Sequence, residues 1–262
     1  MNKMLSQLQT EIAERPRFAP AVTENLLLGR HRLRAAFLQT PLQFARSGMP
    51  LPCAGMAEPT ILLIRSGFAY CSRTLPGGRR ATPRILVSGD YVGLDNIVLT
   101  HTTEEIFAAD RVSYLRLGTA TLRQMLADPC VLMFLLAQIA ETGWRADRLA
   151  ASIGRLDAYA RICVLLLDIH DRLRHRGLIN LPTFNLPLTQ QQIGDHLGLT
   201  LVHVNRTLRR LREEKIVIVD RQVVIIRDIA WMRELAQGLP QSAELRSGAV
   251  PPEATDIVET LA

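Results

Sequence analysis

The amino-acid sequence predicts an α+β fold, and three stretches of its 262 residues support this prediction. Between residues 40 and 118, short β-prone runs alternate with glycine and proline, which is typical of a sandwich or a barrel-like roll. Residues 119–152 keep apolar side chains at helical, near-heptad spacing. Residues 188–219 have the pattern of two short helices joined at a glycine, and a β-hairpin is expected to follow them.

Composition indicates a folded protein with an anionic partner. Hydrophobic residues make up 48% of the chain, enough for a core without disulfides, and the formal net charge is +6. The charge is weak evidence, because Lys3 and Lys215 are the only lysines and an arginine-rich composition also reflects genome bias. No apolar leader or run of membrane length is present, so we expect a cytoplasmic protein without a membrane partner.

The four cysteines, Cys53, Cys71, Cys130 and Cys163, lie far apart and form no CxxC pair. This spacing argues against a zinc site or an iron–sulfur cluster built from this chain alone. We expect free thiols without a redox role, because a redox sensor needs an exposed thiolate of low pKa.

The first half of the chain is expected to begin with a loosely docked lead-in over residues 1–20. One or two short helices are predicted over residues 23–38, with Thr23 as a cap. Turns are expected at Pro76-Gly77-Gly78 and at Ser88-Gly89-Asp90. The predicted strands are residues 61–65, 67–74, 84–87, 91–94 and 106–117.

A long helix is predicted after a short one that Asp128-Pro129 closes. Little of the helix's own domain is available to pack on its apolar seam, so the seam predicts a partner helix. The alternative is that the seam packs onto the chain's own β-roll. Gly154 is expected to act as a hinge. The residues predicted to face the partner are Leu132, Leu135, Leu136, Ile139, Gly143, Ala146 and Leu149.

A further helix is predicted over residues 155–175. Its His170 and His175 have no acidic or cysteine partners at ligand spacing, so both are expected to be solvated. Residues 178–187 are expected to form an extended connector.

The helix-turn-helix pattern begins with a capping box, in which Thr189 and Gln192 each bond the other's backbone amide. Gly198 is expected to end the first helix in a left-handed conformation, and Thr200 to cap the second helix. The second helix is expected to bury one stripe made of Val204, Leu208 and Leu211.

The opposite face of the second helix carries asparagine and arginine, which bind base edges and phosphates. This face favours DNA binding, and a solvated arginine-rich helix is the alternative. Behind it, residues 216–219 and 223–226 are separated by Asp220-Arg221-Gln222 and predict the hairpin wing of a winged helix.

The segment LTQQQIGDHLGLTLVHVNRTLRRLRE closely resembles the DNA-binding module of the Crp/Fnr family of bacterial transcription regulators. Upstream, LIRSGFAYCSRTLPGGRR, VSGDYVGL and IGRLDAYARICVLLLDI are similar to that family in the same order, so the likeness covers residues 26–235. It implies a jelly-roll-like β-roll (a double-stranded β-helix) as sensor domain, a dimerisation helix and a C-terminal winged helix-turn-helix. The expected domains are residues 1–127 for the N-terminal helices and β-roll, 128–154 for the dimerisation helix, 155–237 for the DNA-binding domain, and 238–262 as a disordered tail.

The resemblance also implies how the second helix would bind DNA. Arg206 matches the family's guanine-reading arginine, and Leu201 and Val202 are the other base-reading positions. Val202 stands where the family often has a glutamate that accepts from cytosine, so we expect an altered half-site with a thymine methyl contact. The other candidates are His203 and Asn205 for phosphate or base contacts, and Gln191, Thr200 and Arg209 as phosphate anchors.

The expected partners follow from the same resemblance. They are double-stranded promoter DNA, a second copy of the chain and RNA polymerase. The two-fold homodimer would bind an inverted repeat whose half-sites lie about one helical turn apart.

Effector binding departs from the family's pattern. Members that bind a cyclic nucleotide have a Gly-Glu pair and, about ten residues later, an arginine that neutralises the phosphate. Here the sequence has Gly93-Leu94-Asp95-Asn96 and then Thr103-Glu104-Glu105-Ile106, with no arginine between them. We therefore expect that cyclic AMP is not bound. Gly93 and Asp95 are the candidate contacts for an unidentified effector, and a roll that senses nothing is the alternative.

No cofactor is predicted. Relatives with an iron–sulfur cluster use clustered N-terminal cysteines, which are absent before Cys53. Haem needs an axial ligand, and His31, His101 and Cys71 are expected to be surface or packing residues instead. Two alternatives stay open: a non-specific architectural DNA-binding protein, and a cupin-like enzyme, against which the scattered histidines argue. We expect no enzymatic activity.

Overall fold

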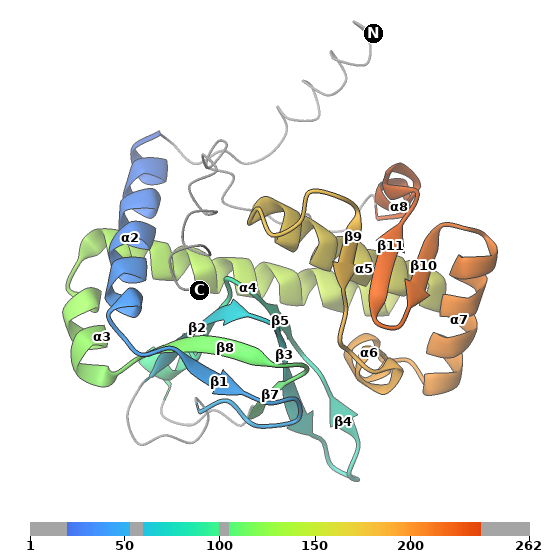
Figure 1. Ribbon diagram of the computed structural model, residues 1–262, viewed down its shortest axis with the longest axis horizontal. Helices are drawn as coiled ribbons and strands as arrows, with labels where there is room; N and C mark the ends of the chain where they lie inside the picture. Colours follow the sequence, from blue (N-terminus) through green and yellow to red (C-terminus); the bar gives the residue numbers. More distant parts are fainter. Residues whose placement is uncertain (1–19, 53–59, 100–104, 237–262) are drawn as a thin grey trace, which may run out of the picture.

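The computed structural model describes residues 20–52, 60–99 and 105–236, and it confirms the α+β fold (Figure 1). Among the described helices, no single one is long and apolar enough to cross a membrane. The helices α3 (Thr119–Leu126) and α4 (Pro129–Arg155), bent by 104° where they meet, pass that test together by length and composition only. The expectations that fall outside the described residues concern the lead-in over 1–19, the tail over 238–262, Cys53, His101, Thr103 and Glu104.

The first described helix, α2 (Pro20–Leu38), is one helix rather than two short ones, and it begins before the expected cap Thr23. It packs along the first turns of the long helix α4. Gly29 permits this close approach, since a Cβ atom there would overlap the carbonyl oxygen of Cys130. Arg32 also reaches across, and its Nη1 lies 2.6 Å from Oδ2 of Asp128.

The β-roll consists of antiparallel strands that enclose an apolar core. One sheet has the order β1-β8-β2-β6, and in the other β3 pairs with β4, β5 and β7. The expected run over 106–117 is two strands, because the chain turns at Asp110, whose carboxylate accepts from the Phe68 amide at 2.7 Å. The bounds are β1 (Gln43–Ala45), β2 (Ile61–Ser66), β3 (Phe68–Thr74), β4 (Arg80–Ala81), β5 (Ile85–Val87), β6 (Tyr91–Val92), the 3-10 helix η1 (Asp95–Ile97), β7 (Glu105–Ala108) and β8 (Val112–Leu117).

Two helices connect the β-roll to the C-terminal part. The short α3 (Thr119–Leu126) precedes α4 (Pro129–Arg155), and Asp128 caps α4 by accepting from two backbone amides. The expected hinge at Gly154 stays a prediction, and in this structure α4 continues through Gly154 to Arg155. The chain instead breaks at Leu156 and begins α5 (Ala158–His175) at the cap Asp157. The expected domain boundaries stay predictions.

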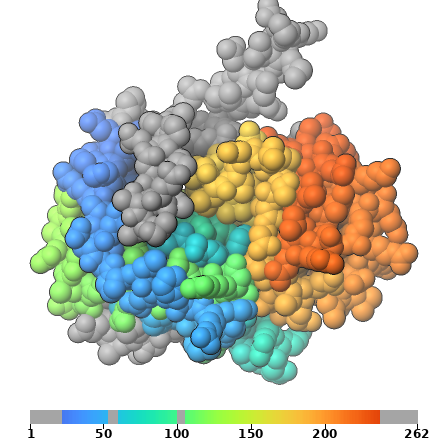
Figure 2. Space-filling view, in the orientation of Figure 1, coloured from blue at the N-terminus to red at the C-terminus, as the bar shows by residue number. Residues whose placement is uncertain are grey.

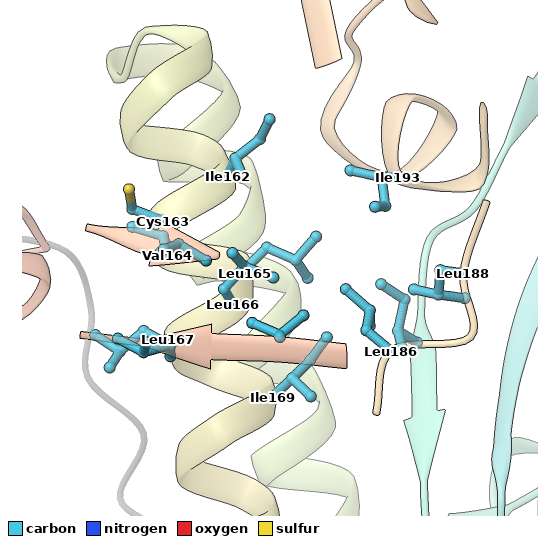
Figure 3. Close-up of a cluster of buried hydrophobic side chains, with 14 of the residues drawn as sticks. Ile162, Cys163, Val164, Leu165, Leu166, Leu167, Ile169, Leu186, Leu188 and Ile193 are labelled. Atoms are coloured by element: carbon cyan, nitrogen blue, oxygen red, sulfur yellow. The ribbon is translucent and has the colours of Figure 1, made fainter. Parts of the chain in front are cut away.

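The C-terminal part folds around α5, with the helix-turn-helix and the wing where they were predicted. The expected connector over 178–187 contains a strand, β9, which pairs with β11 and adds a third strand to the hairpin. Phe184 on this strand is buried. Figure 3 shows side chains of α5 in one apolar core with Leu186, Leu188 and Ile193. The bounds are β9 (Thr183–Asn185), α6 (Gln190–Leu197), α7 (Leu201–Glu213), β10 (Val217–Asp220), β11 (Val223–Ile226) and α8 (Ile229–Leu235).

The expectation that His170 is solvated is wrong, since only 1% of its surface is exposed. Its ring centroid lies 6.4 Å from that of Phe184 on β9. Its Nδ1 is 2.9 Å from Oδ1 of Asp171. Burial alone would raise the pKa of Asp171, but the contacts with His170 and Arg233 lower it below its ordinary value. His175, at the end of the same helix, is exposed as expected.

Arg161 on α5 joins the ends of three helices. Its guanidinium donates to the carbonyl oxygens of Ile153 (2.6 Å) and Leu156 (2.8 Å), at the end of α4, and of Leu197 (3.2 Å), at the end of α6. A cation near helix C-termini is favourable because the last carbonyl oxygens there have no helical partners. The orientation of α6 relative to α4 is therefore fixed through α5.

Candidate DNA-binding surface

The first helix of the pair is built by local sequence signals. The Thr189 amide donates to Oε1 of Gln192 at 2.8 Å, and the Gln192 amide donates to Oγ1 of Thr189 at 3.1 Å, so the capping box is confirmed. Gly198 ends the helix at φ 66°, as predicted. Gly194 was not singled out from the sequence. A Cβ atom on it would lie 2.6 Å from the Leu199 carbonyl oxygen, so glycine lets the turn close.

The second helix, α7, is held by its inner stripe. Val204 and Leu211 are fully buried, and Leu208 packs against the same core. Thr200 caps the helix by accepting from the His203 amide at 3.3 Å, and its hydroxyl is also 3.0 Å from Nδ1 of His203. This expected phosphate anchor therefore already has partners within the chain.

The first two turns of α7 present an open face. Leu201, Val202, Asn205 and Arg206 are exposed, and Val202 has 72% of its surface accessible. Asn205 makes a weak contact, from Nδ2 to Oε1 of Gln190 at 3.2 Å. Arg206 has no hydrogen bond or ion pair with any residue that the structure describes. Its guanidinium is thus available to bind an external acceptor.

The other arginines of α7 are engaged within the chain. Arg209 pairs with Glu213 at 2.8 Å, and Arg212 donates to the Val219 carbonyl at 2.6 Å. Arg210 pairs with Glu214 at 2.7 Å, and its guanidinium carbon lies 4.6 Å from the ring centroid of Tyr159. Exposed pairs of this kind are worth only about 0–1 kcal/mol, so Arg209 can exchange Glu213 for a phosphate.

Gln191, the third expected phosphate anchor, lies on the exposed side of α6. Its Nε2 donates to Oδ1 of Asp195 at 2.7 Å. Both Gln191 and Arg209 already bond a carboxylate, but Arg209 carries a positive charge and Gln191 does not, so Arg209 is the better phosphate anchor of the two.

The wing is a tight hairpin beside α7. Val219 pairs with Val224, and Asp220 with Val223, which leaves Arg221 and Gln222 as the two turn residues. Both have positive φ, at 44° and 74°, as a type I′ turn requires. Asparagine and glycine are the usual residues at these two positions, so a turn made of arginine and glutamine is strained. Arg221 is exposed at its tip.

The helix α4 presents a continuous exposed seam with alternating spacings of four and three residues. Leu136 is 52% exposed, and Leu132 and Ile139 are 43% exposed. Two of the seven predicted partner-facing residues point inward instead: Leu135 is buried against the β-roll, and Leu149 packs on the C-terminal core. The exposed seam consists of Leu132, Leu136, Ile139, Gly143, Ala146, Ala150 and Ile153. That two chains pair along it stays a prediction.

The candidate effector residues lie together at the end of β6. Gly93 has φ +80°, and Asp95 opens the 3-10 helix η1. Of the acids expected to repel a phosphate, Glu105 is described, and it is exposed at the start of β7. Their role in binding an effector stays a prediction.

The candidate haem ligands and thiols occupy different environments. His31 is exposed on α2, and Cys71 is fully buried in the β-roll. Burial, with a smaller effect of Asp157 and Glu214, raises the pKa of the Cys163 thiol to about 12, the opposite of a reactive thiolate. Within the described ranges, no three histidine, cysteine or acidic side chains are grouped to hold a metal ion.

Comparison with known proteins agrees with this arrangement. Residues 160–235 match the model of the Crp-like helix-turn-helix domain. The chain is 29% identical to the nitrogen fixation regulation protein FixK of Azorhizobium caulinodans, over 76% of this chain and 80% of that protein. It is 26% identical to the transcriptional activator protein FnrL of Cereibacter sphaeroides, over 73% and 78%.

Solved structures share the fold. The structure of FixK2 from Bradyrhizobium japonicum superposes with a TM-score of 0.67 at 22% identity, over 75% of this chain and 96% of that one. A transcriptional regulator of the CRP family from Thermus thermophilus gives a TM-score of 0.59 at 17% identity, over 76% and 98%.

Proposed function

Because this chain belongs to the Crp/Fnr family of transcription regulators and carries that family's DNA-binding domain, we propose that it binds an inverted-repeat promoter site as a homodimer. The observation that supports this most directly is the position of Arg206. It is exposed on the second turn of α7 and has no partner among the described residues, whereas its arginine neighbours are paired within the chain.

Arg206 suits base reading rather than backbone binding. A guanidinium free of intramolecular bonds can donate two parallel hydrogen bonds to O6 and N7 of guanine in the major groove. Leu201 and Val202, one turn earlier, offer only apolar surface, which fits the methyl group of thymine. We propose a half-site in which a guanine and a thymine are read by neighbouring turns of α7, with Arg209 on the phosphates.

Dimer formation would use the exposed seam of α4. Its leucine and isoleucine side chains are exposed to solvent in the monomer. They recur at the spacing that allows two helices to pack side by side. A two-fold pairing would place two copies of α7 on one side of the DNA, about one helical turn apart.

We propose that the protein acts in the cytoplasm, contacts RNA polymerase and has no catalytic activity. Cyclic AMP, haem and an iron–sulfur cluster have no part in it. The buried thiols of Cys71 and Cys163 support the absence of a haem or cluster held through them.

The test is selection from a randomised duplex pool at fixed salt with the purified full chain, followed by sequencing of the retained DNA. Enrichment of an inverted repeat is expected. Arg206→Ala should weaken binding by about 1–3 kcal/mol and relax the preference at one base position per half-site. The matched change Arg209→Ala should weaken specific and random duplexes alike. Salt-sensitive binding to all duplexes without enrichment would favour the architectural alternative instead.

A further inference from the structure

A cavity of about 90 Å³ lies where the β-roll meets the C-terminal part. Its walls are the segment from Pro83 to Leu94 around β5 and β6, one face of α4, the middle of α5, and the end of α6. In the space-filling view the yellow-to-red C-terminal part forms one lobe against the teal and green β-roll (Figure 2). Any molecule bound in this cavity therefore contacts both parts of the protein. None of the candidate DNA-binding residues lines it.

The cavity is strongly cationic. Its acids are Asp90 and Asp168, and Glu141, just outside the lining, pairs with Arg145. His196 adds no positive charge at neutral pH, because burial lowers its pKa below the ordinary histidine value. Arginines outnumber these acids in the walls, and they are Arg84, Arg145, Arg148, Arg161 and Arg172.

The two aspartates already form ion pairs with arginines of the chain. Asp90 is bonded by Arg172 and by Arg176, whose Nη2 lies 2.6 Å from Oδ1, and it also accepts from the Val87 amide at 2.8 Å. Asp168 lies 3.5 Å from Nη1 of Arg172. Among the described residues, the arginines of the cavity walls therefore outnumber the acids beside them.

Some buried polar atoms of the walls have no hydrogen-bond partner among the described residues, and two of these belong to residues that carry the argument. One is Oγ of Ser152, a residue with no exposed surface, and the other is Nε of Arg172. A buried donor without an acceptor costs about 1–3 kcal/mol, so such groups in a native protein normally face a ligand or water. Both groups can donate, and an oxyanion supplies acceptors for both.

We infer that this cavity is a binding site for one small oxyanion of phosphate size. Its volume suits a few water molecules or a small anion, and it is well below the 300–1,000 Å³ or so of pockets for drug-sized ligands. The anion would accept from Ser152 and Arg172 and offset the excess charge of the arginines. Since the walls come from the β-roll, α4, α5 and α6, the bound anion stabilises the observed docking of the helix-turn-helix part onto the β-roll.

The test is thermal unfolding of the purified full chain in increasing inorganic phosphate, at constant ionic strength maintained with chloride. We expect a saturable rise in Tm with phosphate and none with chloride, because ligand binding to the folded state stabilises it by mass action. Ser152→Ala should raise the Kd for phosphate by about tenfold, since a hydrogen bond to a charged group is worth that much. Arg84→Gln should also raise the Kd, because it removes one positive charge from the cavity wall. Arg174→Gln, at an exposed arginine of α5 outside the cavity, should leave it unchanged.

Three outcomes would overturn the inference. Phosphate and chloride could shift Tm equally, phosphate could have no effect at millimolar concentration (a cavity filled by water alone), or Arg174→Gln could weaken binding as much as Arg84→Gln. If Arg84→Gln does not fold, Ser152→Ala still decides, because it removes a hydroxyl without a protein partner and keeps the packing. The readout needs no DNA, so failure here leaves the proposed promoter binding untouched.

Discussion

Replacing Asp90 by asparagine should destabilise the protein strongly, because this carboxylate holds the C-terminal part against the β-roll. Asp90 is 4% exposed and is the counter-ion of Arg172, which is buried to the same extent. Asparagine keeps the shape but leaves the Arg172 guanidinium buried without its main negative partner. Removing one partner of a buried pair costs about 3–5 kcal/mol, a large share of the roughly 5–15 kcal/mol that stabilises a typical domain.

The effect should depend on pH in a defined direction. Burial alone would raise the pKa of Asp90, but Arg172, Arg176 and Arg145, with the Val87 amide, hold it well below its usual value. A depressed folded-state pKa means that the contribution is complete above the unfolded pKa, near 3.9, and is lost as the pH falls towards the folded one. The gap in unfolding free energy between the parent and Asp90→Asn should therefore shrink by about 1.2 kcal/mol at pH 3.

The assay is urea unfolding followed by circular dichroism and by tryptophan fluorescence, which reports Trp144 on α4 and Trp231 on α8. Asp147→Asn, the same change at an exposed position on α4, serves as the control and should change stability by less than about 0.5 kcal/mol. A cost for Asp90→Asn below about 1 kcal/mol, or a gap that does not change between pH 7 and pH 3, would refute the reasoning.

Three other predictions follow from the structure. Leu136→Glu should convert a dimer to monomer in light scattering at micromolar concentration, whereas Leu178→Glu, at a leucine of similar exposure outside α4, should not; equal masses for both would contradict pairing through α4. Gly29→Ala should lower Tm by forcing α2 away from α4. Gly154→Ala should raise the free energy of unfolding by about 0.5–1 kcal/mol, because its Cβ atom meets open space in a continuous helix. A lower free energy of unfolding for Gly154→Ala would instead support a hinge at this position. His196 has a lowered pKa in the folded state, so stability should fall as the pH drops below about 6.5, and His196→Gln should flatten that dependence in denaturant titrations between pH 7.5 and 5.5.

The sequence predicted best what short-range chemistry decides. The cap pair Thr189 and Gln192, the left-handed Gly198 and the cap Thr200 each act within three residues of their partners, so their pattern already contains the geometry. The buried stripe of α7 likewise follows from helical periodicity alone. These elements fix the open face on which Arg206 lies.

What depended on long-range packing was missed. Apolar spacing on α4 cannot show which of two adjacent stripes meets the β-roll, so Leu135 and Leu149 were assigned to the wrong face. The burial of His170 required β9, which a proline-bounded segment did not reveal. The cationic cavity joins side chains as far apart as Arg84 and Arg172, whose meeting no local pattern encodes.

The joint made by Arg161 has a bearing on how such regulators diversify. All three of its acceptors are main-chain oxygens, of Ile153, Leu156 and Leu197, so the joint requires one arginine and correctly placed helix ends rather than matching side chains. Sequences on either side can therefore drift independently without loosening it. Consider a chimera that fuses the β-roll and α4 of one relative to the DNA-binding domain of another. It should keep the native angle between these two parts if it retains this arginine and the lengths of α4 and α6.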